Sequence, residues 1–395
     1  MNLHRLLCIG LSTSLALAGC GGGDDDNNTA PRAPTTPGDF TAVVSFGDSL
    51  SDVGTYAPAT SLAGNGTAPY FGGRFTTNGP GAGAWVENLA TSLGIALTPA
   101  EVGFDGRSVK CPAAAVDPSL AATCTAYAQG GARITNPVGI GHNADGSGAL
   151  TVPVVTQITN HLARFGSFKN SDLVLVYAGN NDVFIDLPIY AFVDEQVQGQ
   201  VASGELTAAA AAAQLAAARS AVEADVTAAA TDLADAVKTM TLGRGGRYVA
   251  VMTLVDIADT PFGNAQPAPW RAELTNLSVV FNAALRSGLK DAPVQIIDSF
   301  ALSKEMYADP AKFGFVDHTT PACDSARISV ITGGAVDDGS SLFCNGTPGA
   351  PYNGLVAGAD TITWQFADDV HPTTGGHRAI AAAFTAQLRS FGWIR

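Results

Sequence analysis

Four short runs of apolar residues recur along the chain. Each run is nearly continuous in hydrophobic side chains, as is typical of strands that are covered on both faces. Valine, leucine and isoleucine dominate them, and such residues favour the extended conformation. The runs lie at residues 42–46, 172–177, 247–254 and 294–298. They predict the buried strands of a mostly parallel sheet.

Helical patterns separate these runs. They cover residues 84–93, 154–165, 206–240, 273–289 and 375–390. Strands that alternate with helices predict an α/β fold in which helices cover both faces of the sheet, a three-layer α/β/α sandwich. The segment 206–240 is rich in alanine, the strongest helix former, and is expected to be packing or a lid rather than a ligand site.

Three loops are longer than a compact domain usually tolerates. They lie at residues 58–83, 99–127 and 316–363. Loops of this length often carry binding or catalytic surfaces. We therefore expect these loop insertions, together with the alanine-rich helical insertion, to shape a cleft.

The N-terminus has the layout of an export signal. His4 and Arg5 precede an apolar stretch at residues 6–18, which ends at Leu17-Ala18-Gly19-Cys20. These last four residues resemble a bacterial lipobox. The resemblance implies that residues 1–19 are a lipoprotein signal peptide and that Cys20 becomes the lipidated first residue. The alternative is an ordinary secretory signal with an incidental cysteine.

A polar segment follows the signal. Residues 21–38 are mostly glycine, aspartate, asparagine, threonine and proline, which cannot bury a core. We interpret residues 20–39 as a flexible tether and residues 40–395 as one domain. Gly21, directly after Cys20, resembles lipoproteins that are sorted to the outer membrane of Gram-negative bacteria. An exported protein, anchored by lipid on the periplasmic or cell-surface face, is therefore expected.

The charge of the chain limits its partners. The formal net charge is −14, so no basic surface is expected that would neutralise nucleic-acid phosphates. The same charge disfavours attraction to anionic lipid, so membrane attachment would depend on the N-terminal anchor. The oligomeric state is left open.

The cysteines agree with export. Once the signal is removed and Cys20 is lipidated, Cys111, Cys124, Cys323 and Cys344 remain, and four cysteines allow three pairings. The two close pairs each lie in a loop region, which favours Cys111–Cys124 and Cys323–Cys344 as disulfides in an oxidising compartment. The spacing does not match a zinc site, and the sequence predicts no metal and no cofactor.

One of the apolar runs ends in a serine. In Phe46-Gly47-Asp48-Ser49, the glycine breaks the strand and Ser49 follows at the carboxyl edge of the sheet, where open α/β folds place their ligands. Far along the chain, Asp368-Asp369-Val370-His371-Pro372 offers a histidine and a carboxylate. A serine hydroxyl needs such partners to become a nucleophile.

Four separated blocks resemble the functional blocks of the GDSL-type SGNH hydrolases. They are Gly47-Asp48-Ser49-Leu50, Tyr127-Ala128-Gln129-Gly130-Gly131-Ala132, Gly179-Asn180-Asn181-Asp182 and Asp368-Asp369-Val370-His371-Pro372-Thr373. The resemblance extends from about Val43 to the C-terminus. It implies the family's flavodoxin-like arrangement of a mostly parallel sheet between two layers of helices.

The resemblance also implies a catalytic triad. Ser49 is the expected nucleophile, with Ser51 as its local rival. His371 is the expected base, and Asp368, three residues earlier, is expected to orient it. Asp369 competes for that role. His377, in the following helical pattern, is expected at the surface.

The resemblance further implies an oxyanion hole. Its expected donors are the backbone N–H of Ser49, a glycine N–H and the side chain of Asn181. The glycine maps best to Gly131, but the Gly-Gly pair leaves Gly130 as an alternative. Asp182 is expected to brace the site.

The family match implies a serine esterase or lipase that hydrolyses carboxylic acyl esters through an acyl-enzyme on Ser49. Small esters, lipids and phospholipids are the expected substrates. One alternative is a carbohydrate O-acetyl esterase that acts on cell-surface glycans. Another is a surface lipoprotein that only binds lipid or glycan, without catalysis.

Overall fold

The computed structural model describes residues 32–63 and 73–395. The predicted signal peptide at residues 1–19, the lipidation of Cys20 and most of the predicted tether lie outside these residues, as does part of the loop 58–83. The end of the tether is described. The Gly38 N–H donates to the Trp393 carbonyl at 3.0 Å, and the Trp393 indole donates to the Pro34 carbonyl at 2.7 Å. The packed domain therefore begins several residues before the predicted boundary at residue 40.

The core of the domain is a six-stranded sheet in the order β2-β5-β1-β6-β7-β8, with all neighbouring strands parallel. The predicted apolar runs form four of its strands, β1, β6, β7 and β8. The bounds are β1 (Ala42–Gly47), β2 (Thr98–Pro99), β5 (Cys124–Ala126), β6 (Asp172–Tyr177), β7 (Tyr248–Met252) and β8 (Gln295–Ile297). The mostly parallel sheet of the prediction is confirmed.

The strands β2 and β5, which lie together on one side of the sheet, were not predicted. They are Thr98-Pro99 and Cys124-Thr125-Ala126, which contain no run of large apolar side chains. Both fall in the segment that was expected to be a long loop, residues 99–127, or directly beside it. The same segment contains an antiparallel hairpin of β3 (Glu101–Phe104) and β4 (Arg107–Lys110).

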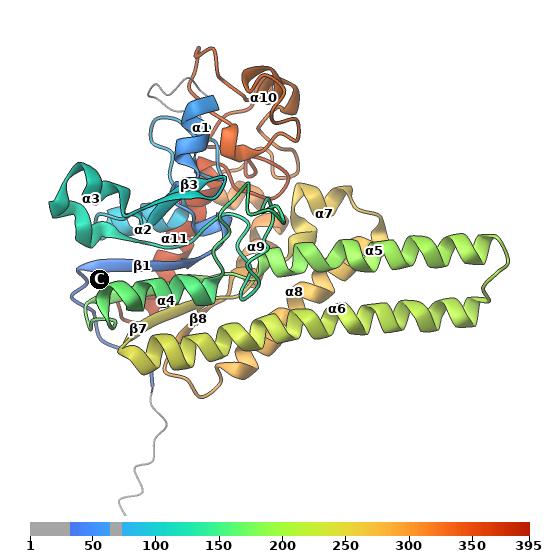
Figure 1. The fold of residues 1–395 in the computed structure, drawn as a ribbon, viewed down its shortest axis with the longest axis horizontal. Helices are drawn as coiled ribbons and strands as arrows, with labels where there is room; N and C mark the ends of the chain where they lie inside the picture. Colours follow the sequence, from blue (N-terminus) through green and yellow to red (C-terminus); the bar gives the residue numbers. More distant parts are fainter. Residues whose placement is uncertain (1–31, 64–72) are drawn as a thin grey trace, which may run out of the picture. The chain divides into compact units, whose positions relative to one another are not determined.

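Helices cover both faces of the sheet (Figure 1). The five predicted helices are present as α2, α4, α6, α8 and α11, and α5 is a long helix that the sequence did not predict. The bounds are α1 (Ala57–Ala63), α2 (Trp85–Ser92), α3 (Pro112–Val116), α4 (Val154–Phe165), α5 (Asn180–Ala202), α6 (Ala208–Ala236), α7 (Pro261–Ala265), α8 (Ala268–Gly288), α9 (Ser299–Ala308), α10 (Ser325–Ile331) and α11 (Thr374–Ser390).

Successive side chains of β6 point to opposite faces of the sheet and so belong to two different cores. Leu173, Leu175 and Tyr177 point into a core that α2 and α11 complete. Val174 and Val176 point into a second core, which α4, α5, α6 and α8 complete. All of these strand residues are buried, so the sheet is covered on both sides as the continuous apolar runs predicted. The domain is a three-layer α/β/α sandwich.

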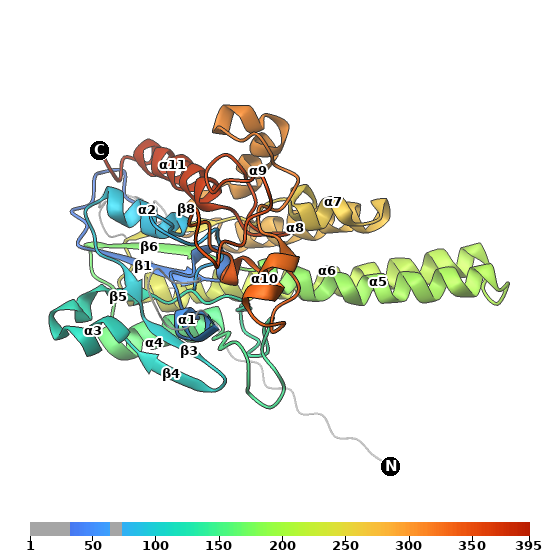
Figure 2. The ribbon, with the colours of Figure 1, turned by 90° about the horizontal axis from the view of Figure 1, so that it is seen from above.

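The alanine-rich segment is a single long helix, α6. It lies beside α5, and the two helices extend together from the sheet (Figures 1 and 2). Arg219 of α6 donates to Glu273 of α8 at 2.7 Å and to the Tyr190 hydroxyl of α5 at 3.2 Å. Among the described residues, no helix is both long and apolar enough to cross a membrane.

Candidate active site

Ser49 begins a 3₁₀ turn directly after β1. The chain leaves the strand through Gly47, where a Cβ atom would lie 2.0 Å from the Tyr177 carbonyl oxygen of β6. Only glycine permits this close approach. The Asp48 carboxylate then accepts hydrogen bonds from the Leu50 N–H at 3.1 Å and the Asn180 side chain at 3.0 Å. The serine is thereby held at the carboxyl edge of the sheet.

The structure brings Ser49 together with residues from the far end of the chain. The Nε2 atom of His371 lies 2.8 Å from the Ser49 Oγ atom. The Nδ1 atom of His371 lies 2.9 and 2.8 Å from the two carboxylate oxygens of Asp368. The three side chains therefore form one continuous path of hydrogen bonds, the arrangement that activates a serine.

Asp368 is buried but ionised. Burial opposes its ionisation, but the charge of His371, with hydrogen bonds from His371 and Ser341, outweighs the burial. Together they hold the pKa of the Asp368 carboxyl well below its usual range. A carboxylate beside Nδ1 holds the ring in the orientation in which Nε2 faces the serine.

The two alternative candidates, Asp369 and Ser51, do not take part in the triad. Asp369 is exposed, and its pKa is raised by partial burial and by the charges of Asp368 and Asp338. The Ser51 hydroxyl is fully buried and accepts a hydrogen bond from the Trp85 indole at 3.1 Å. Neither side chain contacts His371 in the hydrogen bonds of the described residues.

The prediction that His377 lies at the surface is wrong. It is fully buried on the inner face of α11. Its Nδ1 atom accepts from the Trp85 N–H at 3.1 Å, and its Nε2 atom lies 3.2 Å from the Phe75 carbonyl. Burial lowers the pKa of His377 to about 4, so the ring is neutral and structural near neutral pH. His377 lies in the first turn of α11, whose residues Thr374, Gly375 and Gly376 are buried as well.

The backbone hydrogen bonds of Gly130 and Gly131 distinguish the two glycines as possible oxyanion donors. The Gly130 N–H donates to the Asp52 carboxylate at 2.9 Å, and the Gly130 carbonyl accepts from the Tyr56 hydroxyl at 2.7 Å. Across the described part of the chain, the Gly131 N–H has no hydrogen-bond acceptor. Gly131 borders the same cleft as Ser49 and has a φ of +78°. Its amide is available to a ligand, whereas that of Gly130 is not.

Asn181 also borders this cleft, at the start of α5. One amide hydrogen of its side chain is used by the Ala132 carbonyl at 2.9 Å, which leaves the other hydrogen available. The Ser49 N–H likewise has no acceptor within residues 32–63 and 73–395. The three expected oxyanion donors thus all lie around one cleft.

Two buried carboxylates hold the loops that carry these donors. Asp52 accepts from three backbone N–H groups, those of Gly54, Thr55 and Gly130, and burial raises the pKa of Asp52 to about 6. Asp182 accepts from the Arg133 side chain at 3.0 Å. Asp182 therefore braces the site as expected, but the sequence did not reveal Asp52. Only the position of Asp52, three residues after Ser49, could have indicated from the sequence that it belongs to the site.

A cleft of about 720 Å³ opens above Ser49. Its walls are mostly aromatic and aliphatic, and residues from each of the three long loops contribute to them. The lining includes Tyr56, Phe75, Phe104, Gly131, Ile140, Asn181, Phe184, Pro188, Val255, Ile257, Phe262, Asp338, Leu342, Val370 and His371. Such a surface suits an apolar group held next to the serine.

The four remaining cysteines form two disulfides. Cys111 is bonded to Cys124, and Cys323 is bonded to Cys344. These are the pairs that the sequence favoured. Within the described residues, no group of histidine, cysteine, aspartate or glutamate side chains has the arrangement of a metal site.

Comparison with known proteins agrees with the geometry. The family model described as GDSL-like lipase/acylhydrolase matches residues 43–384. A protein of Pseudomonas putida, known as the uncharacterized protein in the trpE-trpG intergenic region, is 32% identical over 162 residues. That match covers 40% of this chain and 24% of the relative, so the chain spans only about a quarter of that protein. Since the family model covers most of the chain, from the nucleophile strand to the last helix, the protein belongs to the GDSL-like lipase and acylhydrolase family of ester hydrolases.

Proposed function

We propose that this protein is a serine esterase that hydrolyses carboxylic acyl esters through an acyl-enzyme on Ser49. The observation that carries the proposal is the 2.8 Å contact between the Ser49 Oγ atom and His371 Nε2. His371 accepts the serine proton as Oγ attacks the ester carbonyl, and then donates it to the departing alcohol. Water attacks the acyl-enzyme with His371 again as the base, which releases the acid and restores Ser49.

Asp368 and the oxyanion donors stabilise the charges that develop. Asp368 holds the imidazole with Nε2 toward the serine and stabilises the imidazolium. The N–H groups of Ser49 and Gly131 and the side chain of Asn181 donate to the negative oxygen of the tetrahedral intermediate. Loss of one such donor typically lowers kcat by about 10²–10³-fold. The free amide of Gly131 supports it over Gly130 in this role.

The cleft supports an apolar acyl group as the part of the substrate that binds next to Ser49. Phe75, Phe184 and Phe262 line it, and the lining has few polar groups for sugar hydroxyls. At its mouth, Phe104 and Ile140 are 37% and 45% exposed, so the apolar surface reaches the solvent. These features favour esters of longer acyl chains, including lipids and phospholipids, over O-acetylated glycans.

Hydrolysis of a p-nitrophenyl ester series, from acetate to palmitate, tests the activity. The expected optimum lies beyond acetate, and Ser49→Ala is expected to abolish turnover while it leaves the fold intact. Activity that is undiminished in Ser49→Ala would refute the mechanism. An optimum at acetate, with activity on acetylated glycan, would favour the carbohydrate esterase. A folded protein that is inactive on every ester would point to a binding protein.

The two adjacent aspartates provide a matched test of the triad. Asp368→Asn should lower kcat by about 10³–10⁴-fold, because the amide no longer stabilises the imidazolium or selects the correct tautomer. Asp369→Asn, one residue away and exposed, should change kcat by less than about threefold. Equal losses in the two variants would contradict the assignment of Asp368.

We also propose that the protein is exported and anchored to the outer membrane through a lipid on Cys20. The His4 to Cys20 layout and the two disulfides of the domain support export. In a Gram-negative host, Cys20→Ser should move the esterase from the detergent-soluble membrane fraction to the soluble fraction. Retention of the Cys20→Ser protein in the membrane would argue against lipid anchoring.

A further inference from the structure

The disulfide Cys323–Cys344 lies in the loop insertion that precedes the triad residues Asp368 and His371. Both cysteines are buried in a small apolar cluster of their own, separate from the two cores that pack on the sheet. Its members are Ala322, Cys323, Ile328, Cys344, Leu355 and Ala367. The last member of the cluster directly precedes Asp368. The insertion is therefore packed against the backbone of the triad carboxylate.

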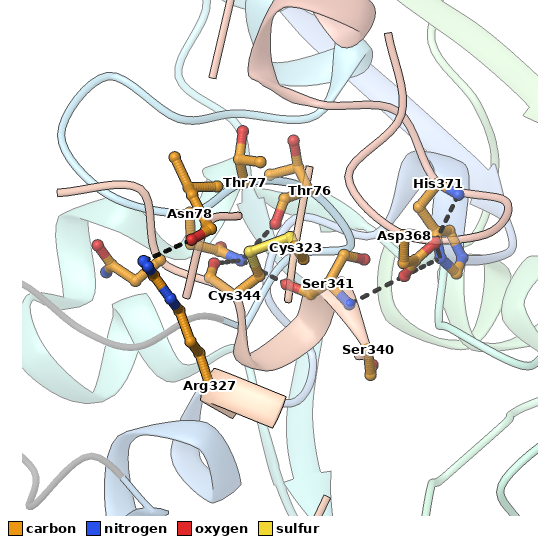
Figure 3. Close-up of a disulfide and its surroundings, with 12 residues drawn as sticks. Thr76, Thr77, Asn78, Cys323, Arg327, Ser340, Ser341, Cys344, Asp368 and His371 are labelled. Carbon is orange, nitrogen blue, oxygen red and sulfur yellow. Dashed lines mark hydrogen bonds and ion pairs between the residues drawn. A yellow bond between two sulfur atoms is a disulfide. The ribbon is translucent and has the colours of Figure 1, made fainter. Parts of the chain in front are cut away.

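The two halves of this disulfide approach Asp368 from different sides. On one side, the Cys323 N–H donates to the Ala367 carbonyl at 2.8 Å. On the other side, the Ser341 N–H, three residues before Cys344, donates to the Asp368 carboxylate at 2.9 Å (Figure 3). The disulfide thus joins a segment that holds the backbone beside Asp368 to a segment that holds its side chain.

The Ser341 amide differs from the other donors to Asp368 because it belongs to a distant segment of the chain. The Val370 N–H, the His371 N–H and the His371 ring also bond to this carboxylate, but all of them belong to the same turn as Asp368. Of the hydrogen bonds in the described residues, the one from Ser341 alone ties the carboxylate to another segment. It therefore fixes the carboxylate relative to the rest of the domain, and not merely relative to its own turn.

A buried asparagine holds the same segment from behind. The Asn78 side chain donates to the Ser341 carbonyl at 3.0 Å and to the Cys344 carbonyl at 3.2 Å. The backbone N–H of Asn78 also donates to the Cys344 carbonyl, at 2.8 Å. Asn78 is 3% exposed. Leu342, beside Ser341, lines the cleft. Residues 340–344, which we call the strap, are thus clamped between Asn78, the disulfide and the triad carboxylate.

We propose that the strap, locked by the Cys323–Cys344 disulfide, positions Asp368 through the Ser341 amide and so sets the turnover rate. The inference rests on the proposed function, because it assigns Asp368 to the orientation of His371. Ser341 is a positioning residue that does not touch the substrate. The loop insertion, which lies outside the four motif blocks, therefore forms part of the catalytic support of this protein.

Ser341→Pro tests the amide itself. Ser341 begins the 3₁₀ turn Ser341–Phe343, a first-turn position at which proline is tolerated, so the substitution removes the N–H with little other change. A hydrogen bond to a charged group is lost, and kcat should fall about 10- to 100-fold. KM should change less than about threefold. Ser341→Ala keeps the amide and removes only the hydroxyl, so its kcat should lie clearly above that of Ser341→Pro.

The rate at which a fluorophosphonate labels Ser49 gives a second readout, independent of ester binding. It should fall in parallel with kcat in Ser341→Pro, since both depend on His371. A merely structural role would lower the melting temperature without this loss per folded molecule. Wild-type kcat and wild-type labelling in Ser341→Pro would overturn the proposal.

The second disulfide provides a matched control. Cys323→Ser/Cys344→Ser should lower kcat per titrated active site at least about tenfold, whereas Cys111→Ser/Cys124→Ser should leave it within about threefold. Equal kcat values for the two double variants would overturn the role of the disulfide. These outcomes are distinct from failure of the proposed function, in which the wild type and the Cys111→Ser/Cys124→Ser protein would also lack Ser49-dependent hydrolysis.

Discussion

At the scale of single residues, the site shows how strongly the surroundings decide what an aspartate does. Burial raises the pKa of Asp48 and of Asp52 to about 6, although both accept hydrogen bonds from backbone N–H groups. Asp368 is equally buried, yet its pKa is low because His371 lies beside it. Asp369 is exposed and does not bond to the imidazole. The same side chain thus caps a turn, holds a loop or orients a base according to what lies within hydrogen-bond distance.

His161 carries a prediction about acid stability. It is 2% exposed and stacks on Phe168 with 4.4 Å between ring centroids, and neither ring nitrogen has a hydrogen-bond partner in the described residues. Burial lowers the pKa of His161 to about 4, below the 6.5 of an unfolded histidine. The unfolded state therefore binds the proton more tightly, and stability that is complete above pH 6.5 is lost as the pH falls toward 4.

His161→Phe should remove this share of the acid sensitivity. Between pH 7 and pH 5, the wild-type free energy of unfolding should fall by about 1–2 kcal/mol more than that of the variant. At pH 7 the variant should be as stable as the wild type or more stable, because phenylalanine leaves no unsatisfied nitrogen in the aromatic cluster. Urea unfolding at both pH values measures this. Parallel losses in the two proteins would show that His161 takes up its proton in the folded state as readily as in the unfolded state.

At the scale of elements, the exit of β1 is the most constrained point of the fold. Gly47 pairs with Tyr177 in register, and the two strand ends approach so closely that no side chain fits at Gly47. The Gln157 side chain also bonds to both the N–H and the carbonyl of Gly47, at 2.9 and 2.8 Å. The strand, the neighbouring strand and α4 together hold the residue that precedes the nucleophile turn.

Gly47→Ala should therefore damage both stability and activity. The new methyl group meets a backbone oxygen that cannot move alone, which should cost about 1–3 kcal/mol of unfolding free energy. The displaced turn should also lower kcat, because Ser49 lies two residues away. Gly199→Ala, in an open stretch of α5, is the control and should stabilise the protein by up to about 1 kcal/mol. Thermal unfolding and ester hydrolysis measure both effects; an unaffected Gly47→Ala protein would disprove the steric account.

The helix pair α5 and α6 shows why the sequence pattern predicts one helix and misses its neighbour. The run of alanines predicted α6 because alanine favours the helix wherever it packs. Helix α5 contains Pro188, and its apolar side chains lie on several sides, toward α6, toward α8 and toward the cleft. No single apolar stripe develops in such a helix, so its periodicity is weak.

At the scale of the whole molecule, the long loops converge on one place. Phe75, Phe104 and Leu342 come from three loops that are distant in the sequence, and all line the cleft above Ser49. The expectation that these loops shape a cleft is confirmed, but the alanine-rich segment 206–240 contributes no residue to its lining. The sheet places the nucleophile, and the insertions build the walls and, through the strap, support the triad. Substrate preference in this protein should therefore depend on the insertions more than on the shared core.

The sequence by itself determined four of the six strands of the central sheet, most of the long helices, the family and the order of the reactive residues. Each of these depends on local propensity, periodicity or a short block such as the one around Ser49, which a linear chain displays directly. Only the tertiary structure decided that Gly131 rather than Gly130 has a free amide, that His377 is buried and that Ser341 holds Asp368. These facts depend on hydrogen bonds and packing between residues far apart in the chain. The spacing of residues along a sequence does not specify which distant donor meets which acceptor once the layers close.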